Sequence, residues 1–524
     1  MSRYQSSRCA RLTLTLASSL FFCGQSLPAQ PSQKASGCTS ASDARKLLSE
    51  ALKALGGESK LRAIETVQLD LTASRQYVEE SERPEGPFIQ DLQHVTEIHD
   101  FKNGRMRRED KVEIPYFPVE PFTTAWVADR DTAVSIRGGK PSPGSATLVA
   151  EAADRLALSP EHVLLSALDS DKLACDGDTV LGSVPHNVIK FPLQGFPARV
   201  FINANTKLPG MVESSGPLAR GGFWRYLGDI DMKVRWTSWS MQKGGVHYPL
   251  QWNVERNGLP DEVFFVHQVV FNPALESGLL SITDDVRAQF KKNPPNSDVE
   301  EVALGGPNQA PEVDAPGIIT IPGAWNVTFV DQGDGVVILE APISSGFSAK
   351  VMDEAGRRFP GKPVKAVITT SDAWPHVAGI REYVARGIPI YALDLNRTII
   401  NRILSESRTV KPDALARNPR KPVIHWISNK TTIGAGANRL EIYPLRGATT
   451  ERQMMVYFPE PQLLYASDAF QWQGDGTLWL PQTVSEVLDG VRKNNLTVNK
   501  YFMMHVELRD WPALQSEFQK EIAQ

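Results

Sequence analysis

The sequence predicts an α+β protein of two domains. Residues 42–290 hold a series of strand patterns with one helix near its start. A polar segment rich in proline and glycine follows at residues 293–316. Beyond it, an apolar strand at residues 364–368 runs through a short polar loop into a helix that opens at Pro375. A chain of 524 residues with 41% apolar residues can form two cores of ordinary domain size.

The first 29 residues have the pattern of an export signal. Arg3, Arg8 and Arg11 precede a mostly apolar run at residues 12–24, and small residues follow up to Ala29. The run is too short to span a membrane, and the rest of the chain has no segment of eighteen apolar residues. We expect cleavage after Ala29 and a periplasmic or secreted location. An uncleaved anchor is the alternative.

The charge of the mature chain narrows the class of partner. Residues 1–29 contain three arginines and no acidic residue, so 53 basic residues face 60 acidic ones and the net charge is about −7. Nucleic acids and anionic membranes require clustered positive charge. The expected partner is therefore a small molecule or an envelope component, with no nucleic acid and no transmembrane span.

Two cysteines, Cys38 and Cys175, remain after removal of the signal. An even pair in an oxidising compartment predicts a disulfide that joins the mature amino terminus to the first domain. Two unpaired thiols are the alternative.

The first domain, residues 30–292, is predicted to be an antiparallel β half-barrel with a helix. The helix covers residues 41–55, with apolar residues at helical spacing, and ends at Gly56-Gly57. Asn257-Gly258 is a strong hairpin turn. The order of strands resembles that of periplasmic lipoprotein carriers. The strand patterns include residues 66–72, 233–241, 246–255 and 263–270.

Tryptophans gather in the last strands of this domain, at Trp224, Trp236, Trp239 and Trp252. Aromatic residues in strands usually serve packing, which is the interpretation we favour. An apolar groove for acyl chains or glycan rings is the alternative.

The loop after residue 369 reads Thr-Ser-Asp-Ala-Trp-Pro-His-Val-Ala-Gly. It resembles the zinc-binding signature of the metallo-β-lactamase superfamily, Thr-His-x-His-x-Asp-His-x-x-Gly. In that frame the two first histidine positions hold Ser371 and Ala373, the aspartate position holds Pro375, and only His376 keeps its donor. Proline is tolerated at the first helical position, so Pro375 preserves the frame while removing a ligand. Asp372 alternates with the ligand positions, and we expect it to point away from the site.

The resemblance continues to the end of the chain and implies an αβ/βα sandwich over residues 317–524. Thr449 stands where the superfamily usually has a histidine, and Asp468 matches its bridging aspartate. Residues 501–507 resemble the strand that delivers its last histidine, here His505. A third histidine downstream of residue 317, His425, is interpreted as a sheet residue. The three remaining donors, His376, Asp468 and His505, predict at most one zinc or iron ion.

Two classes of function follow from this motif. In the first, which we favour, the chain is an exported protein with a degenerate metal site and a non-catalytic binding or envelope role. In the second, a single metal activates water for hydrolysis of an ester, amide or phosphoester.

Overall fold

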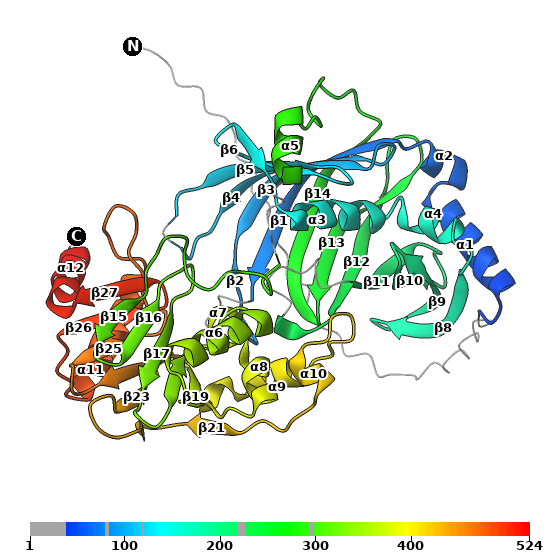
Figure 1. Cartoon of the computed structure of the whole chain (residues 1–524). Coiled ribbons are helices and arrows are strands. Elements are labelled where there is room, and N and C mark those ends of the chain that lie inside the picture. Colours follow the sequence, from blue (N-terminus) through cyan, green and yellow to red (C-terminus); the bar gives the residue numbers. More distant parts are fainter. Residues whose placement is uncertain (1–37, 79–82, 118, 217–225, 293–297, 524) are drawn as a thin grey trace, which may run out of the picture. The chain divides into compact units, whose positions relative to one another are not determined.

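The described residues of the computed structural model are built around three β-sheets (Figure 1). They comprise residues 38–78, 83–117, 119–216, 226–292 and 298–523, and the expected export signal lies outside them. We call the sheets the amino-terminal sheet, the first carboxyl-terminal sheet and the second carboxyl-terminal sheet. Among the described residues, no helix is both long and apolar enough to cross a membrane.

The amino-terminal sheet has fourteen strands, and neighbours along it pair antiparallel, as the predicted series of strands requires. Asn257 and Gly258 both have positive φ, at 48° and 74°, as a tight hairpin turn needs. In the order of the sheet, the strands are β7 (Lys140–Pro143), β6 (Ala133–Arg137), β5 (Phe122–Ala128), β4 (Arg105–Glu113), β3 (Leu92–Asp100), β1 (Thr66–Tyr77), β14 (Leu259–Phe271), β13 (His247–Arg256), β12 (Ile230–Met241), β11 (Pro209–Gly216), β10 (Phe196–Asn203), β9 (Val184–Leu193) and β8 (Ala174–Leu181), with β2 (Ile89–Gln90) beside β1.

Helices cover parts of this sheet. The predicted helix at residues 41–55 is confirmed as α1 (Ala41–Leu55), whose Ser40 and Asp43 form a capping box. The core beneath it contains Trp236 and Trp252, and Trp239 packs against its edge; Trp224 lies outside the described residues. The other helices of this region are α2 (Glu58–Arg62), α3 (Ala146–Ala157), α4 (Val163–Leu168) and α5 (Asp284–Lys292).

A disulfide joins Cys38 to Cys175, with the two Cα atoms 5.5 Å apart. Cys38 precedes α1 and Cys175 lies on β8, so the bond fixes the start of the described chain to the edge of the amino-terminal sheet.

Along the carboxyl-terminal part of the chain, the strands of two further sheets are interspersed with helices. The first sheet runs β15 (Glu312–Ala315), β16 (Ile318–Ile321), β17 (Val327–Asp331), β18 (Val336–Leu339), β19 (Val364–Thr369), β20 (Ile390–Leu393) and β21 (Ile424–Ile427). The second runs β22 (Thr431–Ile433), β23 (Leu440–Pro444), β24 (Met454–Phe458), β25 (Leu463–Tyr465), β26 (Lys500–Met503) and β27 (Val506–Asp510). The helices are α6 (Ser345–Arg358), α7 (Trp374–Val377), α8 (Ile380–Arg386), α9 (Arg397–Ser405), α10 (Ala414–Arg417), α11 (Pro481–Lys493) and α12 (Trp511–Ala523), with a 3₁₀ turn at Asp394–Asn396.

Three apolar cores show how these elements stack. One core joins the first sheet to α6, α8 and α9, as Phe329 and Val351 illustrate. A second lies between the sheets, where Ile368 and Val456 belong to one cluster. A third joins the second sheet to α11 and α12. The order is therefore helix, sheet, sheet, helix, which is the layering expected of the αβ/βα sandwich.

Three local details differ from the sequence-based expectation. Part of the predicted linker is a strand: residues 312–315 form β15, which pairs with β16. The single helix expected after Pro375 is two short helices, broken at Gly379, where a Cβ would lie 2.0 Å from Ser348 Oγ. The strand expected to deliver His505 ends at Met503, so the histidine occupies the turn before β27.

Glu161, beside α4, is a buried carboxyl group that the fold leaves without a hydrogen-bonding partner among the described residues. Burial raises its pKa to about 7 from an ordinary value of 4.5. Between these two pH values the folded state holds a proton that the unfolded state releases. Stability therefore falls as pH rises through this window, and the full penalty applies above it.

We expect Glu161→Gln to stabilise the protein at pH 8 by about 3 kcal/mol and to change little at pH 5. Urea unfolding at both pH values measures this. Glu276→Gln, an exposed substitution, is the matched control. An equal gain at both pH values would contradict the interpretation.

Replacing both Cys38 and Cys175 by serine should lower the free energy of unfolding by about 2–5 kcal/mol, because the bond closes a long loop. Urea unfolding of the chain that starts at residue 30 gives the value. Mass spectrometry without reductant should find no alkylatable thiol in the parent chain, and two per chain would show that the bond is absent.

Candidate functional site

A cavity of about 520 Å³ lies beside the loop that follows β19. Its walls come from the carboxyl-terminal layers and from the amino-terminal sheet. The structure brings every residue of the predicted site to this cavity: Ser371, Ala373, Pro375, His376, Thr449, Asp468 and His505.

The loop keeps its shape without the missing metal ligands. Ser371 accepts a hydrogen bond from the backbone N–H of Ala373 at 3.3 Å, which closes a local turn. Pro375 lies in the first turn of α7, where its missing N–H costs nothing. A local hydrogen bond thus helps to order the start of the loop.

His376 is fully buried between two carboxylates. Its Nδ1 lies 3.1 Å from Glu340 Oε1, and its Nε2 lies 3.8 Å from Asp468 Oδ2. Burial alone lowers the pKa of His376, but the negative charge of Glu340, supported by Asp468, outweighs burial and raises the pKa to about 10. At neutral pH the ring is therefore a cation that lies between two protein carboxylates.

Glu340 is the partner of His376 that sequence reasoning missed. It follows β18, is fully buried, and also accepts hydrogen bonds from Tyr465 Oη at 3.0 Å and from the Thr370 hydroxyl and N–H. The position of Glu340 in the sequence could have indicated this contact. Strands β18 and β19 are parallel neighbours, so a carboxylate at the end of β18 lies at the same edge of the sheet as the loop that follows β19.

Asp468 also faces the second predicted histidine. Nε2 of His505 lies 3.8 Å from the same Oδ2 that faces His376. Donors around one tetrahedral zinc, with bonds of 2.0–2.2 Å, lie about 3.3–3.6 Å apart, so the separations from Asp468 to each histidine are slightly wider than in such a shell. Among the described residues, no group of three or more His, Cys, Asp and Glu side chains could hold a metal ion.

The expectation that Asp372 points away from the site is wrong. Asp372 lines the cavity, and its Oδ2 lies 3.8 Å from Arg452 Nη1. Burial raises its pKa to about 7, although Arg452 opposes the shift. The residue does not continue the strand, because β19 ends at Thr369, so strand alternation does not fix its direction.

The backbone of Thr449 is bound to helix α11. Its backbone N–H lies 3.1 Å from Glu486 Oε1, and the neighbouring Thr450 hydroxyl donates to Glu486 Oε2 at 2.6 Å. The loop that carries a histidine ligand in the superfamily is thus held here by a carboxylate of α11. His425 is stacked on Tyr391 at 4.5 Å on the first carboxyl-terminal sheet, as expected of a sheet residue.

The opposite wall of the cavity is aromatic and was not predicted. Tyr77, Tyr116, Phe117 and Phe122 come from the amino-terminal sheet and its β4–β5 connection. Phe117 lies 5.7 Å from the ring of Trp479, which comes from the carboxyl-terminal layers. Sequence patterns could not place this wall beside the motif loop, because the two are separated by hundreds of positions along the chain.

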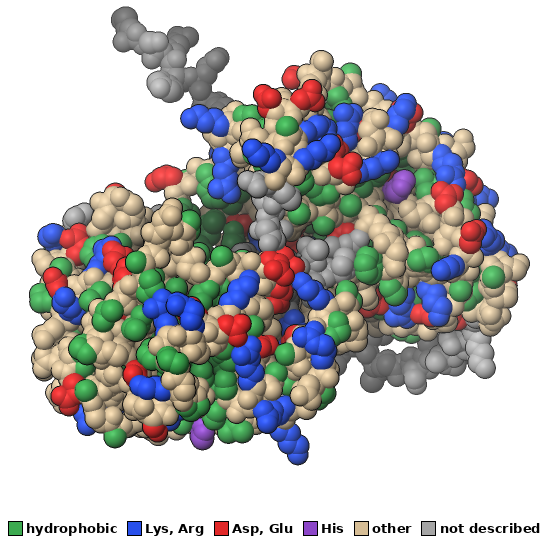
Figure 2. Space-filling view, viewed as in Figure 1, with side chains coloured by type: hydrophobic (Ala, Val, Ile, Leu, Met, Phe, Trp, Pro, Cys, Tyr) green, Lys and Arg blue, Asp and Glu red, His purple; other side chains and the backbone are tan. Residues whose placement is uncertain are grey.

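On the face of the molecule seen in Figure 2, the described side chains do not form a large patch of positive or of negative charge. Basic and acidic side chains are interspersed there. This distribution agrees with the near balance of charge in the composition.

Solved structures similar to this chain are metallo-β-lactamases and alkylsulfatases, the superfamily that the motifs resemble. TMB-1 is 18% identical over 41% of this chain and 100% of its own, with a TM-score of 0.31. FIM-1 from Pseudomonas aeruginosa, in a mono-zinc form, is 14% identical over 42% and 98%, with a TM-score of 0.32. The sec-alkylsulfatase Pisa1 from Pseudomonas sp. is 14% identical over 40% of each chain, with a TM-score of 0.30.

Scores this low carry no weight for activity. No family model and no curated protein matches the chain.

Proposed function

We propose that this chain is an exported protein that binds a small molecule in the first cavity without hydrolysing it. The carboxyl-terminal layers form a metallo-β-lactamase-like domain with a degenerate metal site. The amino-terminal sheet acts as a half-barrel domain that supplies the aromatic wall.

One observation carries this proposal: both ring nitrogens of His376 face protein carboxylates, at 3.1 and 3.8 Å. Ala373 and Pro375 offer no donor to complete a metal shell, and Ser371 is engaged within its own loop. The carboxylates of Glu340 and Asp468 are thus each paired with His376, while the cavity itself remains large enough for a ligand.

The walls define the ligand chemistry. Tyr116 and Phe117 offer aromatic faces on one side, and Asp372, Arg452 and His505 offer polar groups on the other. An aromatic compound with a polar substituent satisfies both sides.

Ligand-observed NMR with a library of aromatic fragments tests this proposal. We expect fragments to bind the parent protein, and Tyr116→Ala to weaken them roughly 3–10-fold through the lost ring contact. Phe265→Ala is the matched control, since Phe265 is a 45% exposed aromatic outside the cavity. Absence of any binding fragment, or equal weakening by the two variants, would contradict the proposal.

A single-metal hydrolase is the second candidate, favoured by the convergence of His376 and His505 on Asp468 Oδ2. The two candidates differ in metal content. After incubation with zinc or iron and removal of the excess, we expect less than about 0.1 ion per chain by elemental analysis, because a shell with two imidazoles and one carboxylate must have its donors closer together.

Turnover gives an independent readout. With chromogenic β-lactam, ester and phosphodiester substrates, the parent and Asp468→Asn should show the same background rate. One ion per chain, lost in His505→Ala together with a measurable turnover, would establish the hydrolase instead.

A further inference from the structure

A second cavity, of about 510 Å³, lies on the amino-terminal sheet against helix α3. Strands β1, β3, β4, β5, β6, β12, β13 and β14 contribute to it. Tyr77 and Phe122 line both this cavity and the first one, so the two are neighbours that share a wall. None of the residues that the superfamily motif singles out belongs to it.

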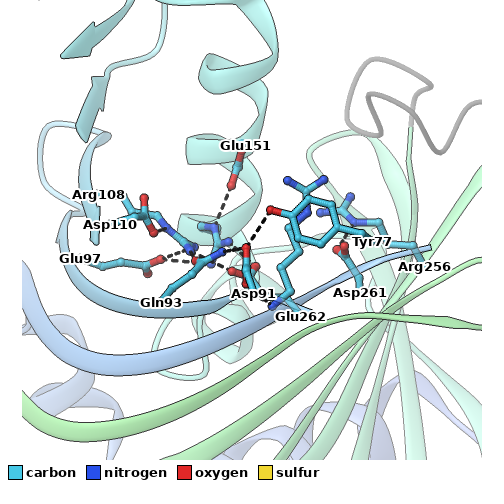
Figure 3. Close-up of polar contacts among 12 residues, drawn as sticks. Tyr77, Asp91, Gln93, Glu97, Arg108, Asp110, Glu151, Arg256, Asp261 and Glu262 are labelled. Carbon is cyan, nitrogen blue, oxygen red and sulfur yellow. Dashed lines mark hydrogen bonds and ion pairs between the residues drawn. The ribbon is translucent and has the colours of Figure 1, made fainter. Parts of the chain in front are cut away.

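The floor of this second cavity is a closed network of charged side chains (Figure 3). Arg108 donates to Glu97 at 3.1 Å and to Glu262 at 2.9 Å, and Arg155 donates to the same two carboxylates at 3.1 and 2.7 Å. Figure 3 shows Glu151 reaching toward this group from α3, where it pairs with Arg155 at 3.2 Å. Two arginines are thus paired with four carboxylates, those of Glu97, Glu262, Asp110 and Glu151.

Because the charges are paired with one another, the floor does not offer an isolated charge to an ion. It does offer hydrogen-bonding groups of both kinds. Asp110 accepts from Arg108 Nε through Oδ1 alone among the described residues, which leaves Oδ2 as an acceptor. Arg108 and Arg155 have more N–H groups than the bonds described here use.

Two hydroxyl groups add to these sites. Thr124 on β5 and Thr147 on α3 both line the cavity, and their hydroxyls make no hydrogen bond to any described residue. A hydroxyl both donates and accepts.

Apolar surface borders the polar floor. Trp126 and Trp252 line the cavity, and the exposed ring of Phe122 stands at the shared wall. The cavity therefore combines aromatic faces with hydrogen-bond donors and acceptors.

We propose that this second cavity binds a neutral polyhydroxylated ligand, an oligosaccharide. Sugar hydroxyls both donate and accept, which matches carboxylates, arginines and threonines, and the apolar faces of sugar rings match the aromatic walls. A bare acyl chain would bury Asp110, Glu262 and the arginines without replacing their hydrogen bonds with water, which is unfavourable. The shared wall at Tyr77 and Phe122 favours a chain of several sugars over a single one.

Isothermal titration calorimetry with maltohexaose, cellohexaose, a mannan hexasaccharide and chitohexaose tests this proposal on the chain that starts at residue 30. At least one should bind saturably. The double variant Thr124→Val/Thr147→Val should weaken that sugar about 5–30-fold, as two lost hydrogen bonds predict.

Thr123→Val is the matched control, because Thr123 is the neighbouring residue on β5, is exposed and does not line the cavity. The Thr123→Val variant should bind the sugar with the same affinity as the parent protein. The proposal is overturned if none of the four hexasaccharides binds at 10 mM (about the weakest affinity of use here), if the double variant binds as tightly as the parent, or if dodecanoate binds and displaces the sugar. Its outcome is independent of metal content and turnover at the first cavity.

Discussion

The buried contact between Glu340 and His376 fixes the floor of the first cavity. Glu340 has a φ of 73°, a left-handed conformation that costs a residue with a side chain about 1–2 kcal/mol. Its carboxylate contacts the loop after β19, the ring of His376 and the hydroxyl of Tyr465 on β25. One buried charge thus ties the first carboxyl-terminal sheet to the second, and the loss of its cationic partner would leave it unpaired in the interior, at a cost of several kcal/mol.

This arrangement orders the motif loop through contacts between protein groups. A metal ion would bind the loop residues to one another through its ligands. Here the imidazole of His376 is the cation between Glu340 and Asp468, and the hydroxyl of Ser371 orders the loop beside it. The cavity above this floor is completed by aromatic residues of the amino-terminal sheet, and Arg452 joins the two halves by its ion pair with Glu85 at 2.8 Å.

Local patterns in the sequence predicted what depends on neighbours along the chain. The helix at residues 41–55, the turn at Asn257-Gly258 and the strand before the motif loop follow from periodicity, capping and turn chemistry. The convergence of His376, Asp468 and His505 followed from the resemblance of spaced motifs. The roles of Glu340 and Asp372 did not, because each depends on which distant side chains the fold brings within reach.

The network of Arg108, Glu97, Glu262 and Arg155 was equally invisible in the sequence. Charged residues on a strand pattern usually indicate a solvated face, and only the structure shows that α3 covers this part of the sheet. Trp252 shows another limit of sequence patterns. It packs in the core, as aromatic residues in strands usually do, but it also lines a cavity.

The proposed replacement of a metal by an internal ion pair depends most directly on the protonation of His376. ¹⁵N NMR of protein labelled at histidine, with His376→Gln to assign the signal, measures it. Both ring nitrogens should carry a proton at pH 7, because Glu340 and Asp468 stabilise the cation, and added zinc should leave the signal unchanged. A neutral ring at pH 7 whose Nε2 signal shifts on addition of one equivalent of zinc would contradict it.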